Sequence, residues 1–248
     1  MKLIISPAKK MNEDMDFLPP EGLPCFVERS QQLLDYLRTL EYGQLKGLLA
    51  CNDQLTQLNF QRYANMDLNK RLTPAILAYE GIQYQYMAPR LFSLEQYDYL
   101  RAHLRILSGF YGILKPFDGV VPYRLEMQAK LNATFSPNLY HFWGGSLAQA
   151  LAAETDTVVD LASKEYSRAV LPYLPNGVRV ISCTFAQRVG GKLKESGTKC
   201  KMARGEMVRF LTEVGADSPQ ALKDFDRLGY RFEPELSRPE QLVFVKLS

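Results

Sequence analysis

The sequence has few of the residues that build metal centres or disulfide frameworks. It contains two histidines and four cysteines in 248 residues, and the cysteines stand far apart, at Cys25, Cys51, Cys183 and Cys200. No C-x-x-C pair and no H-E-x-x-H motif is present, so the common zinc patterns are absent. We therefore expect no metal site, and the scattered cysteines favour the reducing cytoplasm.

Long apolar runs and nucleotide-binding motifs are also missing. No stretch of 18 apolar residues occurs, and the run Leu3–Ile5 is far too short for the apolar region of a signal peptide. Gly190-Gly191-Lys192 lacks the spacing of a P-loop, and no G-x-G-x-x-G appears. We expect a chain that does not cross a membrane and that carries no nucleotide cofactor.

The composition is that of an ordinary globular protein. Apolar residues make up 46% of the chain, aromatic residues 11% and charged residues 23%. This apolar content offsets the entropy of ordering the chain, which excludes disorder as its dominant state. The length favours one large domain over residues 1–248.

Positive charge is concentrated in one segment. The net charge of the chain is +3, but residues 188–209 contain seven basic and two acidic side chains, a local charge of +5. Such a concentration indicates an anionic partner, although a solvated loop and helix face would carry the same charges.

The patterning predicts helices and strands in an irregular order. We expect helices over residues 27–39, 93–107, 146–153 and 204–214 and from Lys164 onward, and strands over 2–5, 139–142, 157–161, 178–183, 229–232 and 242–247. The last two strands are candidates for neighbours in a sheet. This mixture predicts an α+β fold.

Polar residues follow several of the predicted strands. Ser6, Gly144, Gly145 and Ser163 stand where a strand gives way to a turn or a helix. Helix N-termini expose unpaired N–H groups, so these four residues are candidate anion-binding positions. The serines fit equally well as helix N-caps.

The segment 122–127 carries a second candidate site. If it is extended, Arg124 and Glu126 share one face. Such a pair could hold a substrate phosphate beside a general base, or it could be a plain ion pair that supports the loop.

Residues 44–66 resemble a helix-hairpin-helix, whose turn amides bind a nucleic-acid phosphate without reading sequence. Leu58 matches an apolar position of the pattern, Asn59 tolerates the positive φ of a turn, and Arg62 could add a phosphate contact. Gln57 stands where the pattern has glycine, so an ordinary pair of helices fits these residues as well.

Several blocks together resemble one known family. They are residues 5–9 (ISPAK), 107–118 (LSGFYGILKPFD), 122–127 (PYRLEM), 142–144 (FWG), 161–166 (LASKEY) and 201–205 (KMARG). In their order and spacing they resemble the YaaA family of bacterial peroxide stress response proteins, with a likeness that runs from Lys2 to about Lys246.

The resemblance implies a cytoplasmic protein linked to peroxide tolerance. It also implies a distinctive fold, a single mixed-sheet domain with surrounding helices around a basic cleft. A helix-hairpin-helix, binding of double-stranded DNA and a connection to DNA repair come from the same resemblance. It implies no established catalytic activity.

Two hypotheses follow. The first is binding of double-stranded DNA with little sequence preference, because basic side chains displace counterions from phosphates whatever the sequence. The candidate contacts are Lys9, Leu58, Asn59, Arg62, Arg124, Lys201, Arg204 and Arg209.

The second hypothesis is an enzyme that acts on a nucleobase, a nucleotide or a DNA phosphate. Lys9 would be the nucleophile or phosphate ligand, Arg124 the anion clamp, and Glu126 or Glu165 the general base. This hypothesis requires that these residues meet in one pocket.

Overall fold

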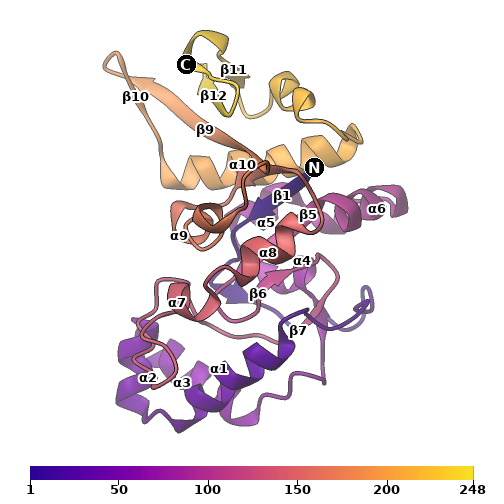
Figure 1. Ribbon diagram of the computed structural model, residues 1–248. Helices are drawn as coiled ribbons and strands as arrows, with labels where there is room; N and C mark the ends of the chain where they lie inside the picture. The colour runs from indigo at the N-terminus through magenta and orange to yellow at the C-terminus, as the bar shows by residue number, and fades with distance from the viewer. Residues whose placement is uncertain (248) are drawn as a thin grey trace.

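The computed structural model describes residues 1–247, and a mixed sheet runs through its centre (Figure 1). Twelve strands are present in these residues: β1 (Lys2–Ile5), β2 (Lys10–Met11), β3 (Thr73–Pro74), β4 (Tyr79–Glu80), β5 (Leu104–Ser108), β6 (Gly112–Leu114), β7 (Gly119–Val120), β8 (Thr157–Leu161), β9 (Arg179–Val189), β10 (Lys192–Lys194), β11 (Tyr230–Phe232) and β12 (Gln241–Lys246).

The helices alternate irregularly with these strands. The α-helices are α1 (Val27–Thr39), α2 (Tyr42–Leu49), α3 (Asp53–Asn65), α4 (Ala75–Ala78), α5 (Ile82–Met87), α6 (Leu94–His103), α7 (Leu139–Trp143), α8 (Ser146–Ala152), α9 (Lys164–Ser167) and α10 (Gly197–Glu213). Four short 3₁₀ helices are η1 (Pro89–Leu91), η2 (Leu171–Tyr173), η3 (Pro219–Asp224) and η4 (Pro234–Leu236).

The main sheet has eight strands, in the order β11-β12-β9-β8-β1-β5-β6, with β10 paired to β9. The five strands from β12 to β5 run parallel, whereas β6, β10 and β11 are antiparallel to their neighbours. The predicted α+β class with a mixed sheet is confirmed, and β11 and β12 are neighbours as expected.

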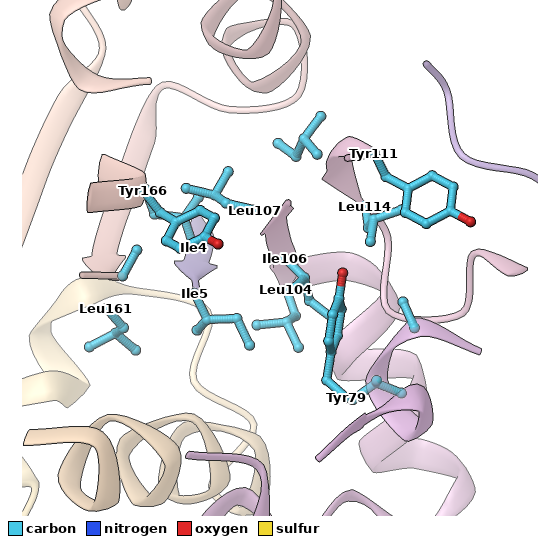
Figure 2. Packing of buried hydrophobic residues seen from close by; sticks show 14 of the residues in the cluster. Ile4, Ile5, Tyr79, Leu104, Ile106, Leu107, Tyr111, Leu114, Leu161 and Tyr166 are labelled. Carbon is cyan, nitrogen blue, oxygen red and sulfur yellow. The ribbon is translucent and has the colours of Figure 1, made fainter. Parts of the chain in front are cut away.

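The strand β1 lies at the middle of this sheet because its side chains are apolar on both faces. Leu3, Ile4 and Ile5 are fully buried, as expected for a parallel strand covered on both sides. Figure 2 shows Ile5 between Leu161 of β8 and Leu104 of β5. Each fully buried Leu or Ile contributes about 1.5–3 kcal/mol relative to exposure.

The parallel strands also bring polar turns to one edge of the sheet. Ile5 is in register with Ile106 and with Leu161, so β1 and β8 end at the same level, whereas β5 continues beyond it to Ser108. The residues that follow these ends include Ser6 and Ser163. Ligands of parallel sheets bind at this carboxyl edge, and the structure has its candidate site there.

Two predicted elements are wrong. Residues 139–142 form the helix α7 rather than a strand, because the Asn138 side chain accepts a hydrogen bond from the His141 N–H and caps a helical turn. The helix predicted over 93–107 ends at His103, and Leu104–Ser108 form the buried strand β5. Its Ser93–Gln96 capping box is present as predicted.

The turn predicted within residues 55–63 is also wrong. These residues lie inside α3, and the turn between the two helices comes earlier, where Ala50 has a left-handed conformation and Asn52 caps α3. Asn59 has no positive φ, is 1% exposed, and donates its amide to the Leu55 carbonyl. The alternative, an ordinary pair of packed helices, describes α2 and α3 as they stand.

Candidate functional site

A cavity of about 390 Å³ opens at the carboxyl ends of β1 and β8. Its lining combines five basic and three acidic side chains with tyrosines, and comprises Ser6, Pro7, Ala8, Lys9, Lys10, Glu80, Gly81, Ile82, Gln83, Tyr84, Tyr123, Arg124, Leu125, Glu126, Ser163, Glu165, Tyr166, Lys201 and Arg204. The structure thus brings together eight of the residues singled out in the sequence: Ser6, Lys9, Arg124, Glu126, Ser163, Glu165, Lys201 and Arg204.

The two serines join the turns after β1 and β8. Ser6 Oγ accepts a hydrogen bond from the Ser163 N–H at 2.8 Å and donates to Ser163 Oγ at 3.2 Å. The Ser6 carbonyl accepts from the Tyr84 hydroxyl at 3.0 Å, which ties the turn to α5. Ser163 is the N-cap residue of α9, but its side chain makes no cap hydrogen bond. Both hydroxyls therefore hold the floor of the cavity.

Buried tyrosines fix the backbone around Arg124. The Tyr63 hydroxyl from α3 donates to the Arg124 carbonyl at 2.5 Å and accepts from the Arg124 N–H at 3.2 Å. The neighbouring Tyr123 hydroxyl lies 2.6 Å from Ser108 Oγ and 2.8 Å from the Tyr79 hydroxyl. The segment also passes close to Gly109, where a Cβ would lie 2.4 Å from the Leu125 carbonyl oxygen. These contacts leave the backbone at Arg124 little freedom.

The charged side chains at the cavity form linked ion pairs. Lys9 Nζ lies 2.8 Å from Glu126 Oε2, and an Arg124 Nη atom lies 3.3 Å from Glu126 Oε1. Arg124 and Glu126 therefore share a face, as the extended segment predicted. Lys10 pairs with Glu80 at 2.7 Å. Three of the five cations are thus partly compensated, and a carboxylate stands between two cations as a candidate base.

Glu165 is a partly buried carboxyl in the lining of the same cavity. Its Oε1 accepts a hydrogen bond from the Gln128 N–H at 3.3 Å, and its carbonyl accepts from the Tyr140 hydroxyl. Burial raises the pKa of the Glu165 carboxyl, and the nearby Glu126 carboxylate raises it further. A carboxyl with a raised pKa is a better proton donor than an ordinary carboxylate, which suits a general acid.

The helices α5 and α10 contribute another part of the lining. They approach closely at Gly205, where a Cβ would lie only 2.1 Å from the Gln83 carbonyl oxygen. This contact places Gln83 and Tyr84 next to Arg204 and Lys201. Gln83 and the tyrosines of the lining are not predicted from the sequence, because no motif marks a lone glutamine or a buried aromatic residue.

Other predicted residues lie outside this cavity. Arg62 and Leu58 line a different depression with Glu13, Arg71 and Pro122, and Leu58 is 42% exposed. Gly144 and Gly145 separate α7 from α8, and neither lines the cavity. Arg209 is on α10 and pairs with Glu213 at 2.8 Å.

Residues 1–247 contain neither a metal-binding cluster nor a membrane-spanning helix. No group of three or more His, Cys, Asp or Glu side chains in this range is arranged to hold a metal ion. No helix in the described part of the chain has the length and apolar character needed to span a membrane.

Comparison with known proteins finds close relatives over nearly the whole length. Residues 1–236 match the family model described as peroxide stress protein YaaA. UPF0246 proteins of Desulfitobacterium hafniense and Lachnoclostridium phytofermentans are each 51% identical over 246 residues, which is 99% of this chain and 98% and 96% of theirs. A UPF0246 protein of Pediococcus pentosaceus is 48% identical over 246 residues, covering 99% of this chain and 98% of its own.

Proposed function

The chain belongs to the peroxide stress protein YaaA family, and on this premise we propose that it binds double-stranded DNA in the cytoplasm during peroxide stress. Binding would be largely independent of sequence, because it would depend on phosphate contacts rather than on base contacts. A link to DNA repair belongs to the same proposal.

The observation that carries the proposal is a group of uncompensated cations on β9, β10 and α10. Of the seven basic side chains in residues 188–209, only Arg209 forms an ion pair within the described chain. The other six are Arg188, Lys192, Lys194, Lys199, Lys201 and Arg204. Figure 1 shows that the β9–β10 hairpin extends away from the body of the protein above the first turns of α10. We call these six side chains the basic ridge.

The exposed hairpin part of the basic ridge suits a polyanion better than the cavity does, whose lining includes the ridge residues Lys201 and Arg204. The hairpin residues Arg188, Lys192 and Lys194 are exposed, so phosphates can reach them without a change of fold. In the cavity, by contrast, Lys9 and Arg124 share Glu126. We therefore assign the main phosphate contacts to the ridge, with Lys9 and Arg124 at its margin. The α2–α3 pair, with Leu58 and Arg62, is a candidate second contact.

The experiment is a fluorescence-anisotropy titration with two short duplexes of unrelated sequence over a range of salt concentrations. The six ridge cations predict that both duplexes bind alike, with a slope of log K against log salt of about −5 to −7 if six to eight phosphates are neutralised. Absence of duplex binding at low salt would refute the proposal.

A second candidate function is an enzyme that acts on a nucleobase, a nucleotide or a DNA phosphate. The specific observation in its favour is that Lys9, Arg124, Glu126 and Glu165 line one cavity, as this hypothesis requires. Arg124 would clamp an anion, Glu126 or Glu165 would move a proton, and Lys9 would act as nucleophile or phosphate ligand.

The enzyme candidate is tested by incubating the wild-type protein with duplex DNA and with free nucleotides and analysing the products by mass spectrometry. Turnover that is lost in Glu126→Gln and Glu165→Gln but kept in Glu213→Gln, a change outside the cavity, would establish it. No product with any of these substrates would exclude it.

A further inference from the structure

Unpartnered hydrogen-bond donors are concentrated in the cavity. Within residues 1–247, six buried side-chain polar atoms have no hydrogen-bond partner. Three of the six are buried N–H groups of residues in the lining of this cavity: Nε2 of Gln83, Nε of Arg124 and Nε of Arg204. A fourth, Oε2 of Glu80, belongs to the same lining and is compensated by Lys10 at 2.7 Å. Leaving a buried donor without a partner is costly, and such groups gather where a ligand supplies the partner.

The chemistry of these donors points to an oxygen-rich anion. All three are donors, two belong to guanidinium groups, and Lys201 adds an ammonium group at the same cavity. Planar guanidinium groups match phosphate and carboxylate oxygens better than any other side chain does. Gln83 belongs to the lining and is only 6% exposed, so its unpartnered amide is shielded from bulk solvent.

The lining also carries carboxyl and aromatic groups, which require that the ligand have hydrogen-bond donors and an apolar face. Glu126 and Glu165 present carboxyl oxygens there, which would repel a simple inorganic anion but accept hydrogen bonds from amino or hydroxyl groups. Tyr84 and Tyr166 add aromatic surface to the lining. The ligand therefore combines an anionic group, hydrogen-bond donors and a flat or apolar part.

We propose that this cavity binds one nucleoside monophosphate unit, with its phosphate on Arg124 and Arg204 and its base edge on Gln83 and Glu165. A cavity of about 390 Å³ is of the size that holds small ligands, and it is too small for a duplex. The choice of a nucleotide rests on the proposed binding of DNA. The unit comes either from free nucleotide or from a nucleotide extruded from duplex DNA. Proteins recognise an extruded base by hydrogen bonds to its edge and by stacking on its ring.

The test measures the binding of defined probes to the full-length protein by calorimetry. The probes are the four 2′-deoxynucleoside 5′-monophosphates and inorganic phosphate. Two variants address the donors: Gln83→Glu replaces the amide with a carboxylate, and Arg204→Lys keeps the charge but removes Nε. Arg231→Lys is the matched control, since it makes the same change on β11 outside the cavity.

The inference expects a nucleotide to bind the wild type more tightly than phosphate does. Affinity should fall about 10-fold or more in Gln83→Glu and in Arg204→Lys, and should stay unchanged in Arg231→Lys. A duplex that carries 2-aminopurine opposite a mismatch separates the two sources. A rise in its fluorescence on binding indicates extrusion, and no rise alongside nucleotide binding indicates free nucleotide.

Three results would overturn the inference: no nucleotide binding to the wild type, phosphate binding as tightly as any nucleotide, or equal affinities in all variants. If anisotropy still shows duplex binding, only the inference fails. If nucleotides bind but duplexes do not, the proposed DNA function fails and the inference stands.

Discussion

Lys9 Nζ lies 2.8 Å from Glu126 Oε2, although 117 residues separate the two along the chain. The pair joins the turn after the first strand to the segment 122–127 across the mouth of the cavity. Because Glu126 also pairs with Arg124, one carboxylate compensates two of the cations that we place at the margin of the DNA-binding surface.

Removal of this carboxylate should strengthen the binding of DNA. In Glu126→Gln, Lys9 becomes available to a phosphate, so duplex affinity at low salt should rise and the salt slope should steepen by about 0.9. Anisotropy against salt measures both. Asp98→Asn, which removes an equally negative group that pairs with Arg101 on α6, should leave them unchanged. A lower affinity in Glu126→Gln would contradict the assignment of Lys9.

The exposed cations of the hairpin should carry much of the salt dependence. Replacing Arg188, Lys192 and Lys194 with alanine should reduce the slope by about 2.7, at about 0.9 for each lost phosphate contact. The matched control replaces Arg90, Arg101 and Arg231, three cations that already pair with carboxylates. If both triple variants reduced the slope equally, the slope would depend on net charge alone, and the hairpin cations would not be the phosphate contacts.

The buried carboxyl of Asp118 predicts a pH dependence of stability. Burial raises the pKa of Asp118 to about 6 from an ordinary value of 3.8, although its Oδ2 accepts a hydrogen bond from the Lys115 N–H. Because the pKa of Asp118 is higher in the folded state than in the unfolded state, its contribution to the free energy of unfolding is greatest below pH 3.8. That contribution is lost as the pH rises through about 6. The free energy of unfolding changes by about 3 kcal/mol over this range, as the shift from 3.8 to about 6 implies.

Asp118→Asn removes this titration while keeping an oxygen that can accept from Lys115. Its free energy of unfolding, relative to the wild type, should therefore rise between pH 4 and pH 7 by roughly the amount set by the pKa shift. Urea unfolding at several pH values measures the difference. A constant difference over this range would show that Asp118 does not titrate as described.

The close packing of α5 on α10 predicts a strong effect of one methyl group. In Gly205→Ala the new Cβ would lie 2.1 Å from the Gln83 carbonyl oxygen, so the helices must separate. Overpacking of this kind costs about 1–3 kcal/mol. Gly197→Ala, on the same helix with open space around it, should be neutral or slightly stabilising. Similar melting temperatures for both variants would contradict the packing argument.

The sequence predicts the regular, buried elements of the fold well, because their patterns are local. The strand β8 has the predicted bounds, and α1 coincides with the predicted residues 27–39. The predicted strand at 139–142 fails because a short run of large apolar residues fits a strand or a buried helical turn equally. The polar residue before it, Asn138, was the signal for a helix.

The candidate site is less predictable, since it forms only when distant segments meet. Arg124 and Glu126 were found because they stand two residues apart in a distinctive block. Gln83 could not be found, because its importance lies in having no partner once α5 packs on α10, and no local pattern encodes that. The helical turn at Ala50 was missed because a non-glycine residue adopts the left-handed conformation there.

The central claim, that the basic ridge faces DNA, is tested most directly by the reactivity of lysines in the complex. Acetylation followed by mass spectrometry, with and without duplex, should show Lys192, Lys194 and Lys201 protected by DNA. The exposed Lys115 and Lys223, which are outside the ridge, should react equally in both samples. Protection of Lys115 and Lys223 with no protection of the ridge lysines would contradict the account.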